Sequence, residues 1–160
     1  MSSKHGKQRK RRPLTNTLAI ALAQATRFTP AELGRMREHL EGHLAALREG
    51  RATRVNFAGI STASELSLAI ETQGVVRGLS EHLERANTAM HAVRRRSDLA
   101  SGWRTPTLHW DELDALTELL RLHLFQLGQL SYGEYQAAWR LMVGRVTSNG
   151  GEIIHESTTT

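Results

Sequence analysis

The chain lacks cysteine altogether and has few aromatic residues, at 5% of its 160 residues. The absence of cysteine excludes disulfide bonds and thiolate metal sites and is compatible with a cytoplasmic location, which we therefore expect. Leucine and alanine predominate, which favours helices over strands. No apolar run approaches the roughly 20 residues that cross a bilayer, so we expect no membrane partner.

Signatures of common enzyme classes are missing as well. There is no cysteine nucleophile, no G-x-S-x-G elbow and no glycine loop followed by a Lys-Ser/Thr helix start. His39 and His43 have a spacing that can hold a metal ion, but no third ligand can be named. We expect His43, like His123, at the edge of an apolar helix face. The sequence therefore predicts a non-enzymatic protein with no catalytic residues, no metal and no cofactor.

Acidic residues are absent from residues 1–12, which hold six of the 21 basic residues of the chain. The rest of the chain keeps 15 basic and 16 acidic residues, so the net charge of +5 belongs to this segment. We expect a disordered basic arm that attracts polyanions through long-range, salt-sensitive forces. The candidate contacts to nucleic-acid phosphates are Lys4, Lys7, Arg9, Lys10, Arg11 and Arg12.

The arm has two alternative interpretations, a solubilising tail and an attraction to an acidic protein or a membrane surface. No aromatic residue interrupts the basic run, so base stacking by the arm is not expected. The apolar stretch that follows, residues 18–23, is too short for a secretion signal. Arg94, Arg95 and Arg96 form a second basic cluster at a helix end. There, compensation of the helix dipole is favoured over a secondary basic patch.

Apolar periodicity predicts an all-α domain over residues 13–148, with four to five helices packed antiparallel as a bundle and a disordered polar tail over 149–160. Capping boxes are expected to start helices after Thr29, Thr62 and Ser131. The apolar stripe over 62–96 fits either one long helix or two helices separated near Gly74. We expect a further helix over 111–129, and loops over 51–61 and 97–109.

Three apolar residues form a candidate partner surface. Leu122 and Phe125 lie opposite the main apolar face of the helix over 111–129, and Trp103 lies in an expected loop. The last two helices have the outline of a DNA-binding helix-turn-helix. The second of them begins with Tyr132, Gly133 and Glu134 and has no base before Arg140, so we do not expect sequence-specific DNA reading.

Three features together resemble small helical proteins of proteobacterial phages and prophages. They are the opening Lys7-Gln8-Arg9-Lys10-Arg11-Arg12-Pro13, the Leu/Ala-rich helices, and the ending Leu130-Ser131-Tyr132-Gly133-Glu134-Tyr135. The resemblance implies an origin in a mobile element and a role in interactions, and it supplies no functional residues.

We therefore predict an accessory protein that binds nucleic acid non-specifically through its arm. The alternatives are a module that binds a host or phage protein, inhibiting or redirecting a host protein, and a structural homo-oligomer. In the oligomer, the helix over 62–96 would pair across a symmetry axis.

Overall fold

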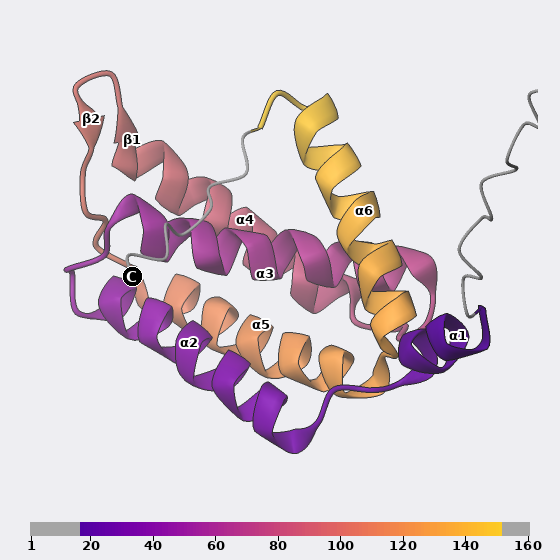
Figure 1. Ribbon diagram of the computed structural model, residues 1–160. Helices are drawn as coiled ribbons and strands as arrows, with labels where there is room; N and C mark the ends of the chain where they lie inside the picture. The colour runs from indigo at the N-terminus through magenta and orange to yellow at the C-terminus, as the bar shows by residue number, and fades with distance from the viewer. Residues whose placement is uncertain (1–16, 152–160) are drawn as a thin grey trace, which may run out of the picture.

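The computed structural model describes residues 17–151, where six helices and one two-residue hairpin account for the regular structure (Figure 1). The predicted arm over 1–12 and residues 152–160 of the predicted tail lie outside the described residues. The all-α class is confirmed. The elements are α1 (Thr17–Ala25), α2 (Pro30–Arg48), α3 (Arg54–Gln73), α4 (Ser80–Ser97), β1 (Asp98–Leu99), β2 (Gly102–Trp103), α5 (Trp110–Gln129) and α6 (Tyr132–Ser148).

Helices α2 to α5 form an antiparallel four-helix bundle. Each helix packs on the next along the chain, and α5 closes the bundle against α2 (Figure 1). Helix α3 is central, because it contacts α2, α4 and α5 within the bundle and α6 outside it. Helix α6 crosses one end of α3, and α1 lies against the start of α6 (Figure 1).

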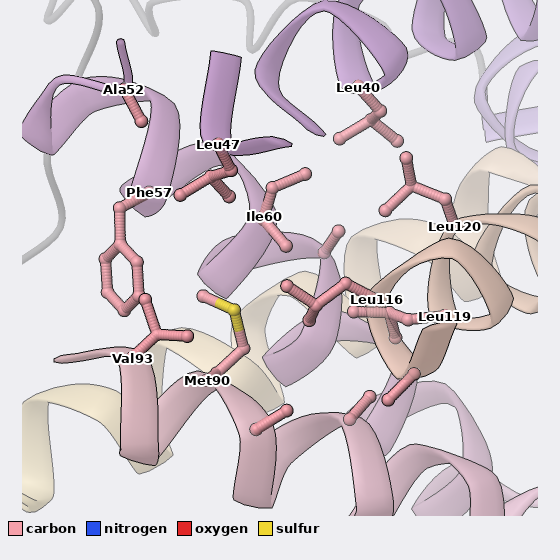
Figure 2. Packing of buried hydrophobic residues seen from close by; sticks show 14 of the residues in the cluster. Leu40, Leu47, Ala52, Phe57, Ile60, Met90, Val93, Leu116, Leu119 and Leu120 are labelled. Carbon is pink, nitrogen blue, oxygen red and sulfur yellow. The ribbon is translucent and has the colours of Figure 1, made fainter. Parts of the chain in front are cut away.

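Aliphatic side chains fill the space between the four bundle helices. Leu47, Ile60 and Leu116 point toward one another from α2, α3 and α5, and Met90 of α4 completes the contact (Figure 2). Leu47, Ile60 and Leu116 are fully buried. Burying one such side chain contributes about 1.5–3 kcal/mol, so this first cluster is a main source of stability for the bundle.

A second cluster of buried side chains lies between α3 and α6. It includes Leu66 and Ile70 of α3 and Met142 of α6, and it also covers Phe28 from the segment between α1 and α2. Half-buried aromatic residues of α6 pack against it. The two clusters therefore share α3, which explains why that helix has buried residues along its whole length.

The expected loop over 51–61 and the expected helix start at Thr62 are wrong. Helix α3 begins at Arg54, because the Thr53 hydroxyl accepts a hydrogen bond from Asn56 N–H while the Asn56 side chain accepts one from Thr53 N–H. Asparagine replaces the usual Glu or Gln of a capping box. Phe57 and Ile60 then enter the first cluster at helical spacing. The Thr62–Glu65 pattern thus lies inside a helix.

The apolar stripe over 62–96 belongs to two helices, which raises the described total to six instead of four to five. Helix α3 ends at Gln73, and the φ of +79° at the next residue, Gly74, places that glycine in the left-handed region. Glycine enters that region without a steric penalty. The Glu71 carboxylate then accepts hydrogen bonds from the backbone N–H groups of Gly78 and Leu79 and from the Ser80 hydroxyl, and α4 begins.

Candidate functional site

Helix α1 is the first element of the folded body, residues 17–151, after the basic arm. At most about 18 Å of extended chain separate Arg12 from Thr17, the first described residue. Helix α1 has no charged side chain and no buried residue, and Leu18 and Leu22 are 69% and 63% exposed. Because α1 lies against α6, the described part of the chain begins beside α6.

The chain that follows α1 is tied to the start of α6. Tyr132 N–H donates a hydrogen bond of 2.8 Å to the Thr26 carbonyl oxygen. The Phe28 ring packs between those of Tyr132 and Tyr135, at centroid distances of 4.6 and 5.2 Å. The Tyr132 hydroxyl donates to the Glu32 carboxylate, and this bond, with those from Thr29, lowers the pKa of Glu32 to about 2. These contacts fix the start of α6 relative to the segment that follows α1.

Two aromatic rings lie on successive turns of α6. The centroids of Tyr135 and Trp139 are 6.3 Å apart, and the ring planes are inclined by 31°. Both side chains are half-buried against the second cluster, and burial raises the pKa of the Tyr135 hydroxyl. With Gln136 and Arg140 they line a cavity of about 350 Å³. Helical periodicity alone assigns Trp139 to the core, so this surface was not predicted.

The three consecutive arginines at the end of α4 have different surroundings. Arg96 donates two hydrogen bonds of 2.8 and 2.6 Å to the buried Glu112 carboxylate at the start of α5. Arg94 Nε lies 3.8 Å from the Asp98 carboxylate. Arg95 is exposed and forms no ion pair with the residues that the structure describes. The secondary basic patch therefore has one cation that is not already paired.

Glu112 shows how Arg96 is used. Burial raises the pKa of the Glu112 carboxyl, but hydrogen bonds from Arg96 and from the His109 backbone N–H outweigh burial, and the pKa lies below its ordinary value. The resulting ion pair joins the end of α4 to the start of α5. This role is consistent with a structural use of the cluster.

The candidate partner surface is only partly exposed. Trp103 is half-buried, since its Nε1–H donates a 3.1 Å hydrogen bond to the Ala52 carbonyl oxygen and its ring lies 5.4 Å from that of Phe57. Leu122 is half-buried against the first cluster. Phe125 is 54% exposed, so it alone of the three is an exposed apolar side chain.

Phe125 borders a groove of about 380 Å³ between α2 and α5. The groove has apolar walls and a charged rim, and it is lined by Leu33, Arg37, Glu41, Leu44, Thr117, Leu120, Arg121, Leu124 and Phe125. The contribution of α2 to this surface was not foreseen, because periodicity along one helix does not show which helix lies next to it. Trp110, 82% exposed at the start of α5, was also missed.

His43 and His123 are more buried than the sequence predicts. His43 is buried between α2 and α3, with its ring nitrogens 3.0 Å from His39 Nε2 and 3.1 Å from Asn56 Nδ2. A Cβ at Gly59 would overlap the His43 ring, so glycine at this position makes room for it. Within residues 17–151, no three His, Cys, Asp or Glu side chains gather as metal ligands.

His123 is also buried instead of lying at the core edge. Its Nδ1 lies 2.8 Å from the Ser67 hydroxyl, and burial lowers its pKa to about 4. The Gln126 side chain donates a hydrogen bond to the Ser67 carbonyl oxygen. These groups join α3 to α5.

The start of α6 does not match a reading helix of a helix-turn-helix motif. Such a helix must present its first turns to the bases. Here, Tyr132 packs on Phe28, and a Cβ at Gly133 would lie 3.2 Å from the Gln24 carbonyl oxygen of α1. This packing supports the expectation that the protein does not read DNA sequence in this way.

Among the described residues, no helix combines the length and apolar character that a bilayer crossing requires. No family model, curated protein or solved structure matches this chain. Function is therefore inferred from the charge distribution and from the surfaces described above.

Proposed function

We propose that this protein is a non-enzymatic, cytoplasmic accessory protein of a phage or other mobile element, and that its basic arm binds nucleic acid non-specifically. The observation that carries the proposal is the separation of charge. Residues 1–12 contain six basic and no acidic side chains, whereas residues 17–151 contain 15 basic and 14 acidic ones. The arm is therefore the dominant source of attraction for a polyanion.

Six of the 15 arginines in residues 17–151 pair with carboxylates, and these are Arg48, Arg51, Arg54, Arg85, Arg94 and Arg96. Arg85 pairs with Glu118, Arg96 pairs with Glu112, and Arg51 pairs with Glu49. Phosphate groups would have to compete with these carboxylates. The arm has no acidic residue that would compete for its cations, so it can neutralise phosphates and release their counterions.

The test is a binding titration with a fluorescent duplex of about 20 base pairs. If all six cations contact phosphates, affinity should fall about 10³-fold between 50 and 200 mM salt. Replacing Lys4, Lys7, Arg9, Lys10, Arg11 and Arg12 by Ala should abolish this binding. The matched control replaces the three lysines by arginine, which keeps the charge and should keep the affinity. Equal binding by the alanine variant and the natural chain would contradict the proposal.

The three lysines of the chain are Lys4, Lys7 and Lys10, and every other basic residue is arginine. Acetylation of lysine side chains therefore neutralises half of the arm and leaves the charges of the body unchanged. We expect acetylated protein to show a salt dependence about half as steep as that of untreated protein. An unchanged slope would show that the three lysines of the arm do not contact phosphates.

A second candidate function, capture of a partner protein, is favoured by the groove beside Phe125. An amphipathic helix could place apolar side chains between α2 and α5 and an acidic one near Arg37 or Arg121. Phe125→Ser should abolish capture of such a partner from host lysate, whereas Leu141→Ser, a matched exposed residue on α6, should not. If both variants capture the same proteins, the groove is not the binding site.

The oligomer hypothesis loses its original basis. The stripe over 62–96 faces inward, since Leu66, Leu83 and Val93 are buried within the described fold. A mass measurement in solution decides this point. A stable dimer that survives Phe125→Ser would require a surface other than the stripe and the groove.

A further inference from the structure

The cavity on α6 differs from the groove beside Phe125 in the chemistry of its lining. Two aromatic side chains, one amide and one guanidinium surround it, in Tyr135, Trp139, Gln136 and Arg140. No acidic side chain lines it. A volume of about 350 Å³ lies near the lower end of the range for small-molecule sites. The lining suits a ligand that is flat, apolar on its faces, polar at its edges and attached to an anion.

The cavity also lies on the helix that α1, the first described element after the arm, contacts. Helix α1 contacts α6, and the Thr26 carbonyl oxygen is bonded to Tyr132 N–H, one turn before Tyr135. The arm itself contains no Phe, Tyr or Trp. A bound strand that is longer than the arm can therefore extend to the aromatic residues that the arm lacks.

We propose that this cavity accepts bases of a single-stranded nucleic acid whose phosphates are held by the basic arm. The inference rests on the proposed function of the arm and adds the class of its ligand. Bases stack on aromatic side chains regardless of sequence, which suits a protein that does not read sequence. In a duplex the faces of the bases are already stacked on one another, so the cavity should favour single strands.

The ring geometry indicates how a base would lie. Insertion of a base between two rings requires a separation of about 7 Å, twice the optimal contact distance between carbon atoms. Tyr135 and Trp139 are 6.3 Å apart and inclined, so no base fits between them. The base instead stacks on the part of a ring that the second cluster leaves uncovered. Gln136 and Arg140 also line the cavity, where they offer an amide for the edge of the base and a cation for the adjoining phosphate.

The experiment compares three fluorescent ligands of equal length with the full chain at one salt concentration: oligo(dT), an abasic strand with the same sugar-phosphate backbone, and a duplex. Stacking of one base should make oligo(dT) bind roughly 5-fold to 150-fold more tightly than the abasic strand. Trp139→Leu should remove this difference and leave the affinity for the abasic strand unchanged. Trp110→Leu, at an exposed tryptophan outside the cavity, is the matched control and should change neither affinity.

A second variant guards against loss of fold. Arg140 is exposed and does not enter the second cluster, so Arg140→Ala should weaken binding of oligo(dT) without disturbing α6. Trp139→Phe keeps an aromatic face and should restore most of the preference for oligo(dT) that Trp139→Leu removes. A purely structural role for Trp139 would give equal losses for oligo(dT) and the abasic strand.

The failure of this inference and that of the proposed function give different results. If oligo(dT) and the abasic strand bind equally and the arm variant binds neither, the cavity takes no base, although the arm binds nucleic acid. Equal binding of duplex and oligo(dT) also overturns the inference. If the natural chain binds none of the three ligands, both the arm function and the base site are wrong.

Discussion

The two clusters of buried side chains differ in composition and in how completely they are covered. The first lies between α2, α3, α4 and α5 and is mainly aliphatic, with Phe57 as its only buried aromatic residue. The second lies under α6 and carries the rings of Phe28, Tyr132, Tyr135 and Trp139. The first cluster is enclosed by four helices. In the outer layer, formed by α1 and α6, the aromatic rings of α6 that cover the second cluster are themselves only half-buried.

This difference separates stability from interaction. The aliphatic cluster consists of side chains that serve packing. The outer layer contains side chains that are large and amphipathic and are only half-covered, which is the usual character of a binding surface. The proposed base site lies in this layer, on α6.

The boundary between the two clusters is a buried polar seam formed by Ser67, His123 and Gln126. Along α3, Ile60 and Ala63 belong to the first cluster, and Leu66 and Ile70 to the second. Along α5, Leu120 belongs to the first and Leu127 to the second. The polar seam hydrogen-bonds α3 to α5 at the point where the two apolar volumes meet.

The largest expected effect tests whether the first cluster contributes more to the free energy of unfolding than the outer layer does. Leu116→Ala leaves a cavity in the enclosed bundle and should cost about 2–5 kcal/mol in the free energy of unfolding. Trp139→Leu in the outer layer should cost less, because solvent and mobile neighbours can fill the space. Urea denaturation of both variants measures the difference. Equal losses would show that the outer layer is as essential as the bundle.

The next effect concerns the polar seam. The pKa of His123 is about 4 in the folded protein and about 6.5 when unfolded. Between these values the unfolded chain binds one proton more than the folded chain, so the free energy of unfolding falls as the pH falls. This contribution is complete above about pH 6.5, and about 3 kcal/mol of it is lost by pH 4.

The check is urea denaturation of the natural chain and of His123→Gln from pH 7 to pH 4. The variant cannot take up this proton, so its stability should fall less over the same range. Both proteins carry the same carboxylates, so their acid responses cancel in the comparison. Parallel curves would show that His123 is not kept neutral by burial in the polar seam.

A smaller effect on stability is expected from loss of the N-terminal cap of α6, in the outer layer. The Ser131 hydroxyl accepts a hydrogen bond from Glu134 N–H and caps α6. Ser131→Ala should cost about 1 kcal/mol. Hydrogen exchange should show faster opening of α6 with little change in α2 to α5. Uniform acceleration across all helices would mean that α6 and the bundle unfold as one unit.

The helices were largely predictable because their signals are local. Thr29 with Glu32, and Ser131 with Glu134, cap α2 and α6 as the sequence indicated. The start of α3 was missed because its capping box uses asparagine and because Gly59 looks like a loop residue. In the fold, Gly59 makes room for the ring of His43, which belongs to another helix. The sequence around Gly59 gives no sign of that contact.

The candidate site was less predictable for the same reason. The positive charge of residues 1–12 is visible in the sequence alone. The pairing of Arg96 with Glu112 depends on two helices meeting, and so does the half-burial of Trp103 and Leu122. Trp139 has the spacing of a core residue. In the fold it packs on the second cluster and is only half-buried, so that part of its ring lines the cavity.

The exposed helix α1 also sets the reach of the arm. Its nine residues span about 14 Å as a helix and about 30 Å when extended. Because α1 buries no side chain, unwinding it would remove no buried side chain from either cluster, although it would break the contacts between α1 and α6. The bond between Thr26 and Tyr132 follows α1 directly. If tension on a strand held by residues 1–12 unwound α1, the chain between the arm and Thr26 would lengthen by about 16 Å before the bond between Thr26 and Tyr132 came under tension.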